Sequence, residues 1–249
     1  MCGIHGILAL RDGALPAPAV LSGMGGVTAH RGPDDEGVYR DARILLGMRR
    51  LSILDLSGGH QPIANEDESL QVVCNGEIYN YRELTAELEA AGHRFRTRSD
   101  TEVLLHLYEE HGDDFVRRLN GMYGFALWDS RRGRLLIGRD RLGIKPVYWL
   151  NDGARLLFAS EAKAILSVPG VTAEIDPVAL QEYLALGYVP GPLSIFRGIR
   201  KLPAGCLLIC EGGRTEIRRF WEMPSAAAPA PSAEDWGREF LETMEKAVV

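Results

Sequence analysis

The 249-residue sequence lacks the features that mark membrane, secreted and nucleic-acid-binding proteins. No apolar run approaches the roughly 20 residues that a membrane-spanning helix needs, and the N-terminus has no basic segment followed by an apolar run. Lys and Arg form no cluster, and the formal net charge of -6 disfavours general binding to nucleic acid. We therefore expect neither a membrane nor a nucleic acid as a partner.

Cysteine is also scarce, with only four residues, and these lack the spacing of a metal or redox motif. Cys206 and Cys210 fall on one face of an expected strand, and Cys74 lies in another, so all three are predicted to be core residues. Such sparse cysteine is typical of a reducing cytoplasm rather than of a disulfide scaffold. The six histidines form no HExxH motif or other ligand cluster, so no metal is expected.

Phosphate-binding loops are missing as well. There is no G-x-x-x-x-G-K-[ST] motif, and the glycines of segment 138–143 do not form a dinucleotide loop because no βαβ unit surrounds them. What remains is an ordinary globular composition, with 46% hydrophobic and 25% charged residues, long enough to bury a sizeable core.

Short strand-like runs dominate the first two-thirds of the sequence, and turn signals separate them. Because helices are few and the strands have hairpin-like spacing, we predict an α+β fold of antiparallel sheets covered by helices, not a parallel βαβ array. The predicted strands are residues 3–10, 43–53, 70–75, 121–129, 134–138, 147–150, 155–159, 206–210 and 216–221.

Three helices are predicted within this region. Asn80 and Glu83 have the spacing of a capping box, and Gly92 would end that helix. A second helix is predicted over residues 101–111, and a third begins at Pro177.

The segment 223–233, MPSAAAPAPSA, is typical of an extended linker. Beyond it, Trp236, Phe240, Met244 and Val248 recur every four residues on one more predicted helix, with Ser232 as its cap. This apolar stripe favours packing against a further domain. The alternative is a helix that folds back on the preceding domain.

Cys2 stands directly after the initiator methionine and is small enough for that methionine to be removed. The residue would then carry a thiol and an α-amine, and such an amine can act as general base for the side chain of its own residue. Gly3 and Gly6 allow the backbone to pass close to a ligand. The alternative is that Cys2 is an incidental buried residue.

Polar clusters follow several of the predicted strands. Residues 30–34 form an expected turn with both charges exposed, and Arg49 and Arg50 extend into an apolar strand. Asn75 begins a further cluster, and Ser99 and Asp100 open the second predicted helix. An arginine fork, carboxylates and amide donors are the groups that bind an α-carboxylate, an α-ammonium and a developing oxyanion.

Six motifs in order resemble the class II glutamine amidotransferases of the N-terminal-nucleophile hydrolase type, and most of all the glutaminase domain of asparagine synthetase. The resemblance runs from Met1 to about Trp221 and implies a four-layer αββα sandwich of two antiparallel sheets. The motifs are MCGIHG at 1–6, HRGPDDEG at 30–37, RRLSILD at 49–55, NGEIYN at 75–80, RSDTEVLL at 98–105 and GRDRLGIKPVYW at 138–149.

This resemblance implies a role for each matched residue. Cys2 would be the nucleophile, and Asn75 with the backbone N–H of Gly76 would form the oxyanion hole. Arg50 would bind the substrate α-carboxylate, and Glu77 and Asp100 the α-ammonium. The wall beside Arg50 would be formed by the backbone of Leu51, Ser52, Ile53 and Leu54.

Three of these assignments also have a simpler interpretation. Asp100 is an ordinary helix N-cap, Asn75-Gly76 is a good type I′ turn dipeptide, and Arg50 could be a surface charge at a strand end. Strand alternation places Arg49 on the opposite face from Arg50.

Full-length asparagine synthetases continue into a domain with an SGG-x-DS phosphate loop, which this sequence lacks. The resemblance thus implies a glutaminase domain over 1–222, a linker over 223–233 and the first helix of a truncated synthetase domain over 234–249. ATP and Mg²⁺ would be cofactors of the missing domain only. L-glutamine is the expected substrate, a synthetase domain or subunit the expected partner, and a homodimer is possible.

Two other functions remain open from the sequence. One is a catalytically silent docking module of a synthetase, since a fold alone does not guarantee activity. The other is a class II amidotransferase with a different acceptor, such as a sugar phosphate or a phosphoribosyl compound.

Overall fold

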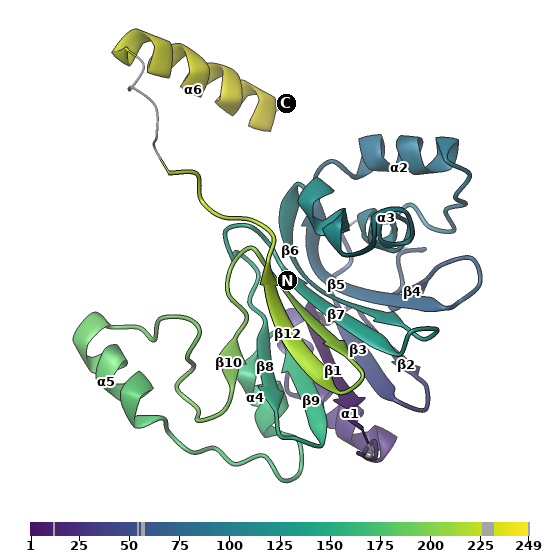
Figure 1. The fold of residues 1–249 in the computed structure, drawn as a ribbon, viewed down its shortest axis with the longest axis vertical. Coiled ribbons are helices and arrows are strands. Elements are labelled where there is room, and N and C mark those ends of the chain that lie inside the picture. Colours follow the sequence, from purple (N-terminus) through teal and green to yellow (C-terminus); the bar gives the residue numbers. More distant parts are fainter. Residues whose placement is uncertain (12, 54, 56–57, 226–231, 249) are drawn as a thin grey trace.

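Two antiparallel sheets of six strands each form the centre of the fold (Figure 1). The computed structural model describes residues 1–11, 13–53, 55, 58–225 and 232–248. The first sheet has the order β10-β8-β9-β1-β3-β2 and the second the order β12-β11-β7-β6-β5-β4. The strands are β1 (Gly3–Ala9), β2 (Asp35–Arg40), β3 (Ile44–Arg50), β4 (Ile63–Ala64), β5 (Leu70–Ile78), β6 (Gly121–Asp129), β7 (Arg134–Arg139), β8 (Tyr148–Asn151), β9 (Arg155–Ala159), β10 (Arg200–Lys201), β11 (Cys206–Glu211) and β12 (Arg214–Arg219).

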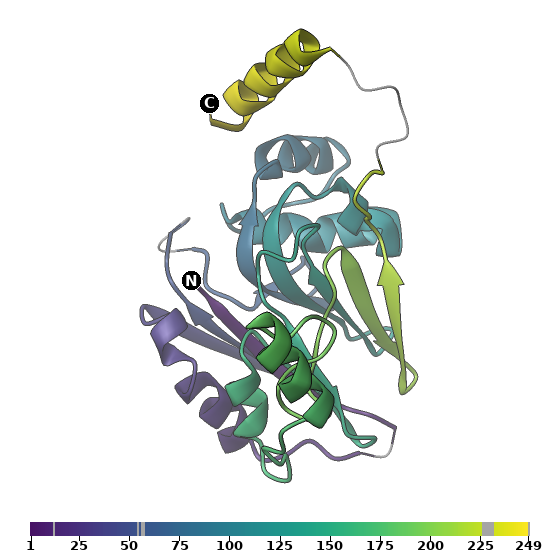
Figure 2. The ribbon, with the colours of Figure 1, turned by 90° about the vertical axis from the view of Figure 1, so that its left-hand side faces the viewer.

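Helices cover the outer face of each sheet. The first sheet carries α1 (Pro18–Gly26) and α4 (Ala162–Leu166), and the second carries α2 (Tyr81–Ala90) and α3 (Val103–His111). Figure 2 shows these helices on opposite sides of the paired sheets. Short 3₁₀ helices lie at Ala29–Arg31, Asp100–Glu102 and Gly112–Arg118.

Strand alternation divides the buried side chains into three layers of core. On β1, Ile4 and Leu8 lie between the sheets, whereas Ile7 packs under α1 and α4. On β5, Val73 lies between the sheets, whereas Val72 packs under α3. Three cores imply four layers, so the predicted αββα sandwich is confirmed.

The largest differences at predicted strand ends are at β3, which was predicted to end at 53, and at β5, which was predicted to end at 75. Among the described residues, β3 ends at Arg50 because no neighbouring strand continues beyond it. Its last pair with β1 is Arg49–Gly3, and its last pair with β2 is Arg50–Asp35. β5 continues beyond Asn75 to Ile78 because β6 offers partners along that whole length.

The helix predicted after Asn80 exists, but the capping box is wrong. The Asn80 side chain makes no cap hydrogen bond. Its amide donates to the Arg118 carbonyl, and its oxygen accepts from the Asn120 N–H. The Asn80 side chain therefore makes tertiary hydrogen bonds instead of capping α2. Gly92, at φ +108°, follows the helix as predicted.

Two helices present apolar side chains to solvent. In α5 (Pro177–Leu186), which Asp176 caps, Tyr183 is 50% exposed. In α6 (Ala233–Val248), which Ser232 caps as predicted, all side chains described are exposed, Trp236 and Phe240 among them. Helix α6 lies away from the sandwich (Figure 1). None of the described helices combines the length and apolarity needed to cross a membrane.

Candidate active site

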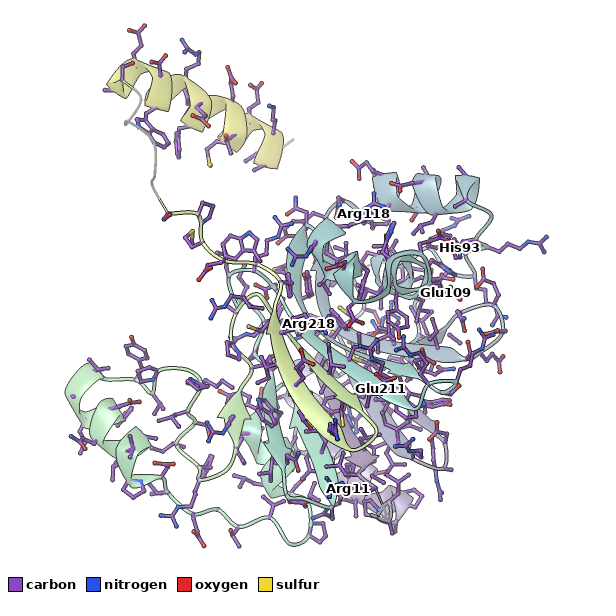
Figure 3. The ribbon with its side chains drawn as sticks, in the orientation of Figure 1. Arg11, His93, Glu109, Arg118, Glu211 and Arg218 are labelled. Carbon is purple, nitrogen blue, oxygen red and sulfur yellow. The ribbon has the colours of Figure 1, made fainter. Side chains whose placement is uncertain are left out.

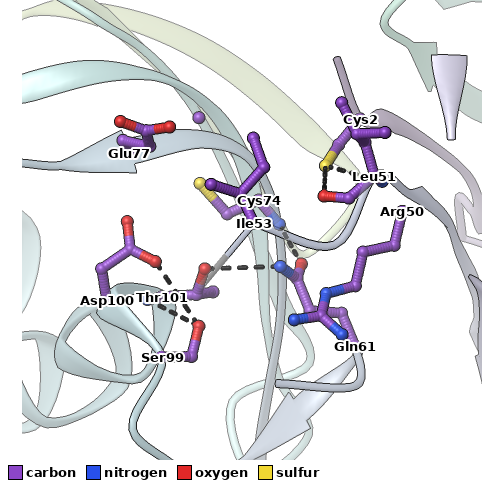
Figure 4. Close-up of a pocket in the computed structure, with 11 residues that line it drawn as sticks. Cys2, Arg50, Leu51, Ile53, Gln61, Cys74, Glu77, Ser99, Asp100 and Thr101 are labelled. Carbon is purple, nitrogen blue, oxygen red and sulfur yellow. Dashed lines mark hydrogen bonds between the residues drawn. The ribbon is translucent and has the colours of Figure 1, made fainter. Parts of the chain in front are cut away.

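One cavity gathers most of the predicted site residues near the start of β1, the end of β3 and the second half of β5 (Figure 4). It includes about 380 Å³ of empty space, counting the solvent at its open mouth. The lining residues that were predicted as site residues are Cys2, Arg50, Leu51, Ile53, Gly76, Glu77 and Asp100. The lining residues that were not predicted are Gln61, Cys74, Ser99 and Thr101. Ser52 and Asn75 are not in its lining, and Leu54 lies outside the described residues.

Cys2 faces the space between the two sheets. It has the same strand parity as Ile4 and packs against the core that Ile4 belongs to. Its Sγ lies 3.4 Å from the backbone nitrogen of Leu51 and 3.6 Å from the Leu51 carbonyl oxygen. The thiol is thus half-buried at the edge of the cavity, held by the backbone that follows β3.

Arg31 is buried, which corrects the prediction that both charges of its turn are exposed; only Asp34 is. The Arg31 Nε donates to the Cys2 carbonyl at 2.8 Å, and Nη1 donates to Glu161 at 2.9 Å. Burial alone would raise the pKa of Glu161, but hydrogen bonds from Arg31, Lys163 and His30 hold it at about 2. A charged pair therefore fixes the backbone of Cys2.

His5 is excluded as the base for Cys2 by its position. His5 lies three residues after Cys2, so strand alternation places its side chain on the opposite face of the sheet, toward α1. A Cβ at Gly47 or Gly25 would lie within 3.2 Å of its Nε2, so two glycines make room for the ring. Burial and the nearby Arg49 lower the pKa of His5 to about 4, which keeps the ring neutral.

Asn75 and Gly76 lie inside β5, opposite Gly124 and Tyr123, so the alternative of a type I′ turn is wrong. A Cβ at Gly76 would come within 2.1 Å of the Met122 carbonyl, which explains why glycine is needed there. Asn75 has the parity of Val73, so its side chain points between the sheets, toward the layer that holds Cys2. It is 1% exposed, and its Nδ2 has no hydrogen-bond partner among the described residues.

Arg50 is buried in the cavity wall, so the alternative of a surface charge is wrong. Its Nη2 donates to the Asp55 carbonyl at 2.9 Å, and a Cβ at Gly59 would come within 2.5 Å of that nitrogen. Arg49 points to the other face, as predicted, where it contacts Glu36 and the Gly25 carbonyl.

Asp100 lies across the cavity from Arg50 (Figure 4). The N-cap of the helix segment is Ser99, whose oxygen accepts from the Thr101 N–H, so the N-cap alternative for Asp100 is wrong. Asp100 instead accepts from the Ile78 N–H at 2.7 Å, which ties it to the end of β5. Burial first, and the neighbouring Glu77 in addition, raise the pKa of Asp100.

Gln61 joins the two sides of the cavity, and the sequence analysis missed it. Its Oε1 accepts from the Cys74 N–H at 2.7 Å, and its Nε2 donates to Thr101 at 3.4 Å. Only the folded chain brings these three positions together. Burial raises the pKa of the Cys74 thiol well above its usual value, so Cys74 stays protonated as a core residue. Cys206 and Cys210 are core residues too, as predicted.

Ser52 is held by its backbone N–H, which donates a hydrogen bond of 2.9 Å to the Asp34 carboxylate.

Away from the cavity, the histidines are less scattered than the sequence suggests. His93 and His106 lie with Glu66 and Glu109, and the prediction that no histidine cluster exists is wrong at this place.

The arrangement of sheets is shared with solved amidotransferases. The chain superposes on glutamine phosphoribosylpyrophosphate amidotransferase from Bacillus subtilis with a TM-score of 0.63. The match covers 88% of this chain and 49% of the other at 20% sequence identity. At that identity the likeness shows that the two chains share this fold, and nothing further.

Sequence comparison gives the family. The glutamine amidotransferase domain family matches residues 1–221, and the chain belongs to it. Asparagine synthetase [glutamine-hydrolyzing] 3 of Bacillus subtilis is 40% identical over 230 residues, covering 90% of this chain and 37% of the relative. The putative asparagine synthetase [glutamine-hydrolyzing] 2 of Methanocaldococcus jannaschii is 40% identical over 247 residues, covering 90% and 47%. The chain thus spans less than half the length of these relatives.

Proposed function

We propose that this domain hydrolyses L-glutamine to glutamate and ammonia, with Cys2 as the nucleophile once Met1 has been removed. The observation that carries the proposal is the placement of a half-buried Cys2 thiol and a buried Asn75 amide on facing sheets. A buried amide donor without a partner costs free energy unless something uses it. Met1 is 63% exposed, so it is accessible to a peptidase.

The reaction begins when the α-amine of Cys2 takes the thiol proton. The sulfur attacks the side-chain amide carbon of glutamine, and Nδ2 of Asn75 and the N–H of Gly76 stabilise the oxyanion. When the C–N bond breaks, the amine returns its proton to the leaving ammonia. Water then adds to the γ-glutamyl thioester, and cleavage of the C–S bond yields glutamate and restores the thiol.

The opposite charges of the cavity suit an amino-acid substrate. The Arg50 guanidinium binds the α-carboxylate, while Glu77 and Asp100 bind the α-ammonium. The backbone of Leu51–Leu54 contributes the wall beside Arg50. Gln61 supports this arrangement because it fixes β5 against the segment that carries Asp100.

The ammonia passes to a synthetase domain or subunit that amidates aspartate or a related carboxylate. Support comes from the names of the relatives and from the apolar side chains that α5 and α6 expose. ATP and Mg²⁺ belong to that synthetase, and the proposed hydrolysis of glutamine uses no cofactor. Several expectations stay predictions. They are the domain division at 222 and 233, the cytoplasmic location, the homodimer, and the lack of membrane or nucleic-acid partners.

The decisive experiment combines kinetics with mass spectrometry. The purified chain is expected to begin at Cys2, to release glutamate from glutamine, and to gain one label from an electrophilic glutamine analogue. The Cys2→Ala variant is expected to lose both activity and label, while Cys206→Ala keeps both. A chain that retains Met1 and takes no label would instead be a docking module.

A further inference from the structure

Four side chains that could bind a metal ion converge beside α3, outside the cavity already described. Glu66 comes from the turn between β4 and β5, His93 from the segment after α2, and His106 and Glu109 from one face of α3. One ligand atom from each lies within 4.8 Å of the others. Figure 3 shows His93 and Glu109 together at this place.

The two imidazoles present the same ring atom to both carboxylates. Nδ1 of His106 lies 3.2 Å from Glu109 and 3.7 Å from Glu66. Nδ1 of His93 lies 3.7 Å from Glu109 and 3.8 Å from Glu66. Ligands about 2.0–2.2 Å from a tetrahedral zinc ion are roughly 3.3–3.6 Å apart, so only small side-chain shifts separate these atoms from such a geometry.

The second nitrogen of each imidazole faces another carboxylate. Nε2 of His93 lies 3.0 Å from Glu110, and Nε2 of His106 lies 3.7 Å from Glu102. Glu102 is itself held by the backbone N–H groups of Arg96 and Thr97, both at 2.7 Å. Carboxylates in this outer position orient metal-binding histidines and fix which ring nitrogen faces the ion.

We propose that Glu66, His93, His106 and Glu109 bind a zinc ion. Two imidazoles favour zinc over magnesium or calcium, which prefer oxygen ligands, and the two carboxylates balance the charge of the ion. His106 is fully buried and His93 is 12% exposed, so the two imidazoles are shielded from water, whereas Glu66 and Glu109 lie on the solvent side of the site. Four protein ligands leave no open position, which is typical of a structural site rather than a catalytic one.

The ion would join three segments that are separate in sequence. One of them, the stretch after α2, leads directly into Ser99, Asp100 and Thr101 in the wall of the cavity. Zinc would therefore stabilise the segment that carries Asp100, in addition to the hairpin around Glu66. Metal binding itself does not depend on the proposed glutaminase activity.

The competing account is a charge network without metal. Burial opposes a charge on His106, but Glu102, Glu109 and Glu66 together raise its pKa to about 9 in the metal-free arrangement. A protonated His106 would then hold the carboxylates together. The two accounts differ in whether the chain binds zinc in a defined ratio.

The test uses the untagged chain, stripped with a chelator and dialysed against micromolar zinc chloride. We expect one equivalent of zinc by elemental analysis, and a melting temperature that rises on zinc addition. His93→Gln and Glu66→Gln are expected to weaken binding at least 100-fold, and Glu110→Gln about 10–100-fold. His111→Gln, at the exposed end of the same helix, is the control and is expected to bind like the parent chain.

Circular dichroism verifies that each variant folds, which matters most if the buried His106 is also replaced. The proposal is overturned if the folded parent chain binds no stoichiometric zinc. It is also overturned if His93→Gln and Glu66→Gln retain the parent affinity, since the metal would then be adventitious, on Cys2 for example. Glutaminase assays of the same samples show separately whether the catalytic proposal holds.

Discussion

The Arg31 guanidinium donates a hydrogen bond of 2.8 Å to the main-chain carbonyl of Cys2, the proposed nucleophile. Its other end binds Glu161, whose ionised form these contacts stabilise. The side chain of Arg31 also lies 3.4 Å from the position of a Cβ at Gly3, so it packs along the backbone of the first two residues of the processed chain. Arg31 thus fixes the backbone of Cys2 and does not itself line the cavity.

Replacing Arg31 by Gln is expected to lower kcat by about 10–100-fold with a smaller change in KM. The reason is that small displacements of a reacting group strongly reduce rate, while the groups that bind substrate stay in place. Steady-state glutaminase kinetics measure both constants. His30→Gln is the matched control, because His30 binds the same Glu161 from an exposed position; an equal loss in both variants would contradict the positioning role.

The Asn75→Ala variant is expected to lose about 10²–10³ in kcat, the usual effect of removing one oxyanion-hole donor. Since Nδ2 has no partner among the described residues, the loss of stability should be small by comparison. Kinetics and thermal unfolding are measured on the same samples. A variant that unfolds but keeps the parent kcat when folded would show that Asn75 is only a core residue.

Substitution of Arg50 by Lys and of Asp100 by Asn is expected to raise KM for glutamine much more than it lowers kcat, because both groups bind the unreactive end of the substrate. Burial raises the pKa of Asp100, so the parent KM should begin to rise with falling pH earlier than for an exposed carboxylate. Protonation removes the negative charge that binds the ammonium. In Asp100→Asn, the rise of KM with falling pH should disappear. If KM still rises in this variant, a group other than Asp100 causes the pH dependence.

The stability of the fold should depend on His5 between pH 6.5 and about 4. The pKa of His5 is lowered to about 4 in the folded chain, so the unfolded chain binds the proton first. Stability is therefore lost as the pH falls through this window, by on the order of 3 kcal/mol, since one pKa unit is about 1.4 kcal/mol. Urea unfolding of the parent and of His5→Gln measures this slope, and an unchanged slope in the variant would contradict it.

Much of the fold could be predicted from short strand-like runs separated by turn signals. On β6 the prediction was residues 121–129, and the strand is Gly121–Asp129, because its buried residues are apolar on both faces between two neighbouring strands. Elements without a strong pattern were missed, among them α1, where Gly and Ala leave little contrast between faces, and β2, whose residues are mostly polar.

The sequence by itself determined that the chain has antiparallel sheets covered by helices, since side-chain periodicity is local. The expectation of two sheets in four layers came from the resemblance to a known family. The sequence also placed Cys2, Arg50, Asn75, Glu77 and Asp100 in motifs of that family. Only the tertiary structure decided that Arg31 meets Cys2, that Gln61 joins Cys74 to Thr101, and that His93 meets His106. These contacts are made where separate elements pack, and packing brings together positions whose local sequence carries no record of each other.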